Sequence, residues 1–162
     1  MKITITTGTG SGPTALAAFD AALLQSGVGN YNLIPLSSVI PPSSELQQDC
    51  YIAPVSEFGH RLYVVISSQQ AIEPGVEAWA GLGWVQDTSG KGLFVEHHGL
   101  NEAGVSQDIH RSLSAMVANR SHDQYGSICS RLVGITCEKQ PVCAVVIAVY
   151  ENQGWQLGGI AL

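Results

Sequence analysis

Residues 29–42 read Gly29-Asn-Tyr-Asn-Leu-Ile-Pro-Leu-Ser-Ser-Val-Ile-Pro-Pro42. The run from Tyr31 to Leu36 predicts a strand that leads directly into the pair Ser37-Ser38. The diproline cannot continue a central strand, so a loop is expected from Ser43 to Asp49. On their own, the two serines are turn residues, as most such pairs are. A strained turn would nevertheless let the Ser38 hydroxyl attack the carbonyl of the residue before it.

Upstream of this stretch, the pattern predicts a strand, a glycine-rich turn and a helix. The strand alternates isoleucine with threonine and is expected to end in the segment from Thr7 to Gly12. That segment precedes a helix, so a phosphate site has to be considered, but the GxGxxG spacing and the GK[ST] ending are absent. A flexible turn is therefore the favoured interpretation. The helix begins near Pro13, ends at Gly27, and carries apolar residues at helical spacing: Leu16, Phe19, Leu23 and Leu24.

Downstream, strand patterns dominate and one further helix is expected. Asn101 is a typical helix N-cap, and the apolar positions that follow it have helical spacing: Val105, Ile109, Leu113 and Met116. The turn Asp87–Gly90 joins two strands as a hairpin. Two helices and about seven strands predict one layered α+β domain. The strands in this part of the chain are expected at Arg61 to Ser67, Ala78 to Val85, Gly92 to Glu96, Ser127 to Cys137, Val142 to Tyr150 and Trp155 to Ile160.

The composition favours an oligomeric protein that does not bind nucleic acid. The 162 residues fit one domain, and only 12% of them are charged, against about a quarter in an ordinary soluble domain. Surface buried between identical copies would explain this, and a Gly- and Ser-rich polar surface is the alternative. The net charge of −6 argues against nucleic acid, which selects basic surfaces, and is compatible with a cationic substrate.

The compartment is predicted from the cysteines and the apolar runs. The four cysteines show no CxxC spacing, no signal peptide is recognisable, and no apolar run approaches the roughly 18 residues of a membrane span. We therefore expect a cytoplasmic, reduced protein with no membrane partner.

Conventional catalytic motifs are missing from the sequence. Adjacent strand residues point to opposite faces, so His97 and His98 cannot both ligate one ion without a bulge, and no metal is expected. No GxSxG elbow is present, and no cysteine has a recognisable protease signature around it.

Three segments nevertheless resemble one family of enzymes. The block from Asn30 to Pro42 resembles the self-cleavage segment of the pyruvoyl-dependent arginine decarboxylases. The similarity extends upstream through Ala18-Phe-Asp-Ala-Ala-Leu-Leu24 and Gly27-Val-Gly29. Downstream, Gly92-Leu-Phe-Val-Glu-His-His-Gly99 is similar to the family's strand that carries a catalytic glutamate, although its two histidines depart from the family pattern. The three segments occur in the family's order and span most of the chain.

The resemblance implies that the chain cuts itself between Ser37 and Ser38. Ser38 would attack the Ser37 carbonyl, and elimination and hydrolysis would then leave a pyruvoyl group at position 38 as a covalent cofactor. The single domain of residues 1–162 would become a β subunit of residues 1–37 and an α subunit of residues 38–162. The pyruvoyl ketone would react with the α-amino group of the substrate and act as an electron sink, as pyridoxal phosphate does elsewhere.

Three further residues match functional positions of the family. Asn32 matches an asparagine tied to processing and to the active site, and its alternative role is a strand residue making a turn bond. Glu96 matches the glutamate that protonates the carbanion left by CO2 loss, although without the resemblance it is a solvated charge at a strand end. Asp20 matches the acidic residue that meets the arginine side chain, although it is otherwise an exposed helix charge.

The resemblance also implies a four-layer αββα sandwich assembled as a homotrimer, with active sites between neighbours. L-Arginine, converted to agmatine and CO2, is the expected substrate. Two alternatives stay open: a pyruvoyl-dependent decarboxylase of aspartate or S-adenosylmethionine, and an unprocessed homologue without catalytic activity.

Overall fold

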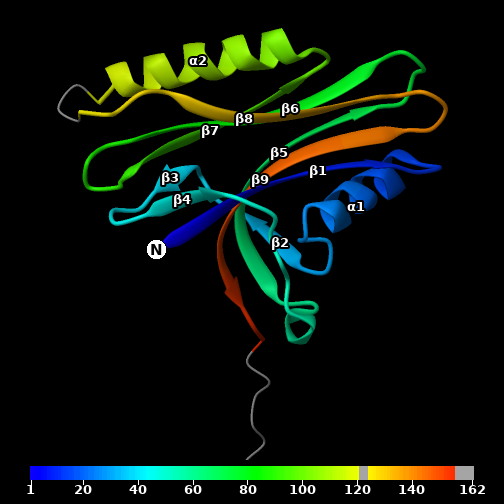
Figure 1. Ribbon diagram of the computed structural model, residues 1–162, viewed down its shortest axis with the longest axis horizontal. Coiled ribbons are helices and arrows are strands. Elements are labelled where there is room, and N and C mark those ends of the chain that lie inside the picture. The colour runs from blue at the N-terminus through cyan, green and yellow to red at the C-terminus, as the bar shows by residue number, and fades with distance from the viewer. Residues whose placement is uncertain (121–123, 156–162) are drawn as a thin grey trace, which may run out of the picture.

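The computed structural model describes residues 1–120 and 124–155, which form a mixed α+β fold with two helices and two sheets (Figure 1). The predicted fold class is confirmed at this level. The helices are α1 (Ala15–Gln25) and α2 (Glu102–Ala118), with a short 3-10 helix at Val55–Glu57. The strands are β1 (Lys2–Ser11), β2 (Asn32–Pro35), β3 (Val39–Ile40), β4 (Glu45–Gln48), β5 (Arg61–Ala71), β6 (Glu77–Gln86), β7 (Gly92–Gly99), β8 (Cys129–Thr136) and β9 (Val142–Gln153).

The strands divide between a first sheet in the order β2-β5-β9-β1-β4 and a second sheet in the order β3-β7-β6-β8. In the first sheet, β9 runs antiparallel to both β5 and β1, while the outer strands β2 and β4 run parallel to their neighbours. The second sheet is antiparallel throughout. The chain therefore enters the second sheet at β3, directly after the serine pair.

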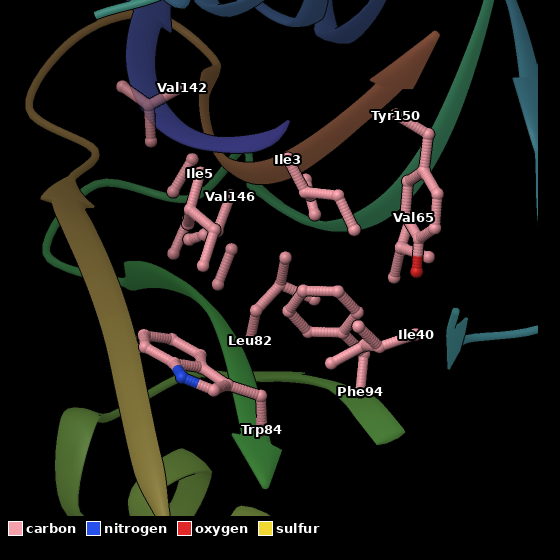
Figure 2. Packing of buried hydrophobic residues seen from close by; sticks show 14 of the residues in the cluster. Ile3, Ile5, Ile40, Val65, Leu82, Trp84, Phe94, Val142, Val146 and Tyr150 are labelled. Atoms are coloured by element: carbon pink, nitrogen blue, oxygen red, sulfur yellow. The ribbon is translucent and has the colours of Figure 1, made fainter. Parts of the chain in front are cut away.

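Strand β9 separates two hydrophobic clusters, because its side chains alternate between the two faces of the first sheet. The odd-numbered side chains from Cys143 to Val149 pack with Ala18 and Ala22 of α1. The even-numbered side chains from Val142 to Tyr150 pack against the second sheet. Figure 2 shows this cluster between the sheets, with Leu82, Trp84 and Phe94 of the second sheet beneath Ile3, Ile5 and Val146 of the first; Trp84 and Phe94 meet edge to face.

Glycines allow α1 to lie directly on β1. A Cβ atom at Gly10 would lie 2.4 Å from the backbone nitrogen of Ala22, and one at Gly8 would lie 2.1 Å from the Ala22 carbonyl oxygen. The prediction that the Thr7–Gly12 segment is a turn was wrong, because β1 continues to Ser11 and presents these glycines to the helix. The helix itself is confirmed, with Thr14 as its N-cap, but its buried side chains are Ala18 and Ala22, and Leu16 is 75% exposed.

Helix α2 and the neighbouring hairpin follow the sequence prediction. Asn101 caps the helix by accepting a hydrogen bond from the Gly104 N–H at 2.7 Å. The predicted turn between β6 and β7 is present, with Gly90 at a φ of +82°. The helix covers β6 and β7 of the second sheet with its buried face, which carries Val105, Ile109 and Leu113.

Two expectations for strands need separate comment. The loop predicted from Ser43 to Asp49 was wrong, because β4 pairs in parallel with β1 along the edge of the first sheet. The diproline only turns the chain, with Ser43 at a φ of +59°, and an edge strand can begin after it because it needs hydrogen bonds on one side only. The strand expected from Trp155 to Ile160 lies outside the described residues from position 156 onward.

Within the described residues, no helix is long and apolar enough to cross a membrane.

Candidate active site

The Ser37-Ser38 pair lies where the chain crosses from the first sheet to the second. Strand β2 ends at Pro35, and the Leu36 N–H still donates to the Val64 carbonyl of β5 at 2.8 Å. Strand β3 begins at Val39 and pairs with β7. Ser37 is exposed and Ser38 is half-buried. The peptide bond between the serines therefore joins two segments that are held in different sheets.

The backbone of Ser38 is strained. Its φ is +62°, in the left-handed region that side chains with a Cβ disfavour. Such a conformation costs about 1–2 kcal/mol in a residue other than glycine. The Ser38 carbonyl accepts a hydrogen bond from the Phe94 N–H at 2.8 Å, so β7 holds the residue in this conformation. A strained turn at this bond was the condition that self-cleavage required.

Glu96 accepts a hydrogen bond from the hydroxyl group of the strained serine. The Ser38 Oγ donates to the Glu96 Oε1 at 2.5 Å, a length typical of a strong hydrogen bond to a carboxylate. Strand β7 places Glu96 on the same face as Phe94, directed toward the first sheet, while Leu93 and Val95 face α2. A carboxylate in this position can take the hydroxyl proton as the oxygen attacks, and can later return a proton to a carbon atom nearby.

The two histidines after Glu96 point to opposite faces of β7, as predicted. The His97 Nε2 lies 2.8 Å from the Ser112 Oγ of α2, and the His98 Nδ1 lies 2.6 Å from the Gln69 Oε1 of β5. In the part of the chain that the structure describes, no three His, Cys, Asp or Glu side chains gather closely enough to hold a metal ion.

Asn32 lies at the opposite end of β2 from the serine pair. Its side-chain amide donates to the Gly59 carbonyl at 2.7 Å, and the Trp155 indole N–H donates to the same oxygen at 2.9 Å. Asn32 is exposed. Beside it lies a cavity of about 240 Å³, lined by Asn30, Tyr31, Ala53, Pro54, Val55, Glu57 and Phe58. Within one chain, the structure does not bring Asn32 to Ser38.

Asp20 is also separate from the serine pair within one chain. It is exposed on α1, which packs on the face of the first sheet turned away from the second sheet. Ser38 and Glu96 are thus the predicted residues that one chain brings together.

Two groups near Ser38 were missed from the sequence: the Phe94 backbone N–H and the Tyr150 hydroxyl. The Tyr150 hydroxyl donates to the Val39 carbonyl at 3.0 Å. Burial raises the pKa of Tyr150, and the nearby charge of Glu96 raises it further. The two bonded residues are separated by 111 positions in the chain, so no local pattern could have revealed the contact.

Several known proteins are similar to this chain. A family model described as pyruvoyl-dependent arginine decarboxylase matches residues 2–154. A protein of that name from Halobacterium salinarum is 41% identical over 95 residues, which are 59% of this chain and 59% of that protein. One from Thermococcus kodakarensis is 30% identical over 142 residues, covering 87% of this chain and 88% of the relative. A solved structure of pyruvoyl-dependent histidine decarboxylase at pH 8 is 15% identical, covers 67% of this chain and 63% of its own, and has a TM-score of 0.44.

Proposed function

The chain belongs to the pyruvoyl-dependent arginine decarboxylase family, and on that basis we propose that it cuts itself and then decarboxylates L-arginine to agmatine and CO2. The observation that carries this proposal is the contact between Ser38 and Glu96. Ser38, with a φ of +62°, donates a hydrogen bond from its hydroxyl to the Glu96 carboxylate at 2.5 Å, next to the bond to be cut.

The cut would use the chain's own atoms. The Ser38 Oγ attacks the Ser37 carbonyl carbon, Glu96 takes the hydroxyl proton, and the Ser38 nitrogen leaves as an amine, which makes an ester between the two residues. Loss of the Ser38 α-proton and of the Ser37 carboxylate then leaves dehydroalanine at position 38. Addition of water and release of ammonia convert this residue into the pyruvoyl group. The products are residues 1–37 and residues 38–162, both parts of one domain.

The residues around position 38 fit a pyruvoyl group. The Phe94 N–H already binds the carbonyl of residue 38 at 2.8 Å, and the Glu96 carboxyl lies beside the side-chain position. The group would supply a ketone that reacts with the α-amino group of arginine and accepts the electrons released with CO2. Glu96 would then hold the proton that is delivered to the substrate carbon.

Asp20 and Asn32 would complete the site from a neighbouring copy of the chain. A carboxylate at Asp20 can bind a guanidinium group through two parallel hydrogen bonds, and this accounts for arginine as the substrate. Asn32 would donate a hydrogen bond to the developing oxyanion. The separation of both residues from Ser38 in one chain supports a site shared between copies.

The assembly would be a homotrimer of four-layer αββα sandwiches. The packing of α1 and α2 on different sheets supports this arrangement of layers. The low charged fraction supports burial of surface between copies. So do exposed apolar side chains at the end of the molecule that carries Asn32, called here the Asn32 end; Val55 is 95% exposed there and Phe58 74%. A cytoplasmic location, without a nucleic-acid or membrane partner, is part of the proposal, and it is supported by the four free thiols and the acidic net charge.

The mass of the purified protein under denaturing conditions tests the cut. The parent should give two chains, and Ser38→Ala should give one chain of about the full 17.1 kDa. Ser43→Ala is the matched control, because Ser43 also has a positive φ, +59°, but lies beyond the diproline, and it should cut like the parent. A parent that stays as one chain would show that this is an unprocessed homologue.

The substrate is tested by separate incubation with arginine, aspartate and S-adenosylmethionine. Agmatine and CO2 are expected from arginine. Release of β-alanine from aspartate without agmatine from arginine would reject arginine as the substrate and leave the cut in place.

A further inference from the structure

The hydroxyl group of Tyr150 holds Val39, the second residue after the cutting site. It donates to the Val39 carbonyl at 3.0 Å, and its ring contacts the Phe94 ring edge to face, with centroids 6.2 Å apart. Figure 2 shows the Tyr150 ring entering the space between the sheets with its hydroxyl directed toward Ile40 and Phe94. Tyr150 is the last buried residue of β9, with 9% of its surface exposed. The first sheet thus reaches across to the chain segment that begins the second.

A bulge in β9 lies at Tyr150. Along the pair β5·β9, Val64 is opposite Val149 and Tyr63 is opposite Glu151, so Tyr150 is the extra residue in β9. A bulge bends its strand and redirects a side chain, and bulges are frequent beside active sites. Tyr150 stays in the row of even-numbered side chains that face the second sheet.

The segment from Ser38 to Ile40 is therefore held from two sides. Strand β7 binds the Ser38 carbonyl through the Phe94 N–H at 2.8 Å and pairs with Val39 and Ile40. The Tyr150 hydroxyl binds the next carbonyl, that of Val39, from the first sheet. Because β3 has only two residues, each of these bonds is a large part of what fixes it.

Burial and the charge of Glu96 raise the pKa of Tyr150, so its hydroxyl keeps its proton and stays a donor. The Val39 carbonyl is thereby satisfied inside the protein, where an unpaired carbonyl would cost free energy.

We propose that Tyr150 is a positioning residue, which fixes Ser38 for attack on the Ser37 carbonyl and anchors the new chain end after the cut. Both roles rest on the proposed function, because both assume that the chain is cut before Ser38. Before the cut, the hydroxyl limits the movement of Val39 and thereby keeps the Ser38 Oγ beside Glu96. After the cut, residue 38 becomes a free chain end, and Tyr150 still holds the residue next to it.

The test compares Tyr150→Phe with Tyr63→Phe. Both changes remove one hydroxyl from adjacent strands, but the Tyr63 hydroxyl donates to the Gln153 Oε1 at 2.8 Å, outside the site. By denatured mass against time, Tyr150→Phe should cut about five- to tenfold more slowly than the parent, as expected for the loss of one buried hydrogen bond. Tyr63→Phe should cut within about twofold of the parent rate, the range of a change outside the site.

Two further measurements separate positioning from general stability. Per cut chain, Tyr150→Phe should lower kcat for arginine several-fold and leave KM unchanged, because the hydroxyl that is lost is bonded to the Val39 carbonyl. In an uncut Ser38→Ala background, Tyr150→Phe should also speed hydrogen exchange at the Val39 and Ile40 amides, and Tyr63→Phe should not.

The outcomes distinguish this inference from the proposed function. Parent-like cutting, kcat and exchange in Tyr150→Phe, in a parent that does cut, would overturn the role of Tyr150 alone. A parent that never cuts would reject the proposed function, and the exchange measurement on the uncut chain would still decide whether the hydroxyl anchors residues 38–40.

Discussion

Glu96 is the residue on which both proposed reactions, the cut and the decarboxylation, depend. Its carboxylate accepts a hydrogen bond from the Ser38 hydroxyl at 2.5 Å in the uncut chain, and its side chain faces the first sheet from β7. The same oxygen is thus placed to receive a proton from Ser38 during cutting and to deliver one to the substrate afterwards. One side chain would serve two steps because both occur at position 38.

Replacing Glu96 by glutamine should slow both steps. The amide can still hydrogen-bond to Ser38 but cannot take its proton, so we expect cutting and decarboxylation each to slow by about 10²–10⁴-fold, the usual value of a positioned acid or base. Denatured mass against time measures the first rate, and agmatine release per cut chain measures the second. Glu138→Gln is the control, because Glu138 is exposed in the turn before β9. Full agmatine release by Glu96→Gln would reject the proton-donor role.

At the scale of elements, the contact between α1 and β1 decides how closely helix and sheet approach. Gly8 and Gly10 of β1 lie directly beneath the Ala22 backbone of α1. Any side chain there would push the helix outward, and with it Asp20 on the exposed side. The glycines therefore set the position of Asp20, the residue proposed to bind the substrate, although they lie far from the cut.

Gly10→Ala should destabilise the protein. The added Cβ would lie 2.4 Å from the Ala22 nitrogen and 2.5 Å from the Ala18 carbonyl oxygen, and backbone atoms cannot give way as a side chain can. In the uncut Ser38→Ala chain, we expect the free energy of unfolding to fall by about 1–3 kcal/mol, measured by urea titration. Gly126→Ala is the control, since its new Cβ would meet one atom, the Gln86 oxygen, at 3.3 Å. An unchanged midpoint for Gly10→Ala would show that α1 shifts at no cost.

The sequence predicted elements wherever one local rule dominated. Asn101 and the apolar spacing after it predicted α2 with its buried face, and Asp87–Gly90 predicted the hairpin between β6 and β7. The sequence-based prediction was wrong where a residue far away in the chain decides which element forms. The glycines of β1 suggested a turn because their need for space comes from α1, and β4 forms because the edge of β1 is open to it.

The same distinction applies to the candidate site. The family resemblance predicted that Ser38 and Glu96 belong together, and the structure brings them into contact across 58 positions of sequence. The positive φ of Ser38 and the Tyr150 bond were not predictable, because both result from how the two sheets hold the crossing segment. The roles of Asn32 and Asp20 stay predictions, since each lies away from Ser38 within one chain.

At the scale of the whole molecule, the Asn32 end differs from an ordinary protein surface. Val55, Phe58 and Trp155 are exposed there, at 95%, 74% and 58%, and the indole of Trp155 shares the Gly59 carbonyl with Asn32. Clustered exposed apolar side chains mark a surface that binds another protein. A second copy of the chain on this surface would cover Asn32.

Phe58→Asp should therefore break the assembly. A charge in a buried apolar contact is strongly unfavourable, so the mass of about three times 17.1 kDa that the proposed trimer would have should fall to that of one copy. Light scattering on the eluted protein measures this mass. Ile72→Asp is the control, since Ile72 is 65% exposed beyond the opposite end of β5 and should leave the assembly intact. A Phe58→Asp protein that keeps the parent mass would place the contact elsewhere.

The crossing between the sheets has a consequence for how the molecule is made. Residues 1–37 supply β1, which lies between β9 and β4, together with β2, which pairs with β5. A cut after Ser37 would thus leave the shorter piece held along β1 and β2 by strands of the longer one. Before the cut, refolding is a first-order event of one chain, whereas afterwards it requires two pieces to meet and its rate depends on their concentration. Folding as a single chain must then precede cutting. A processed molecule that unfolds in dilute solution would refold slowly, because its two pieces rarely meet.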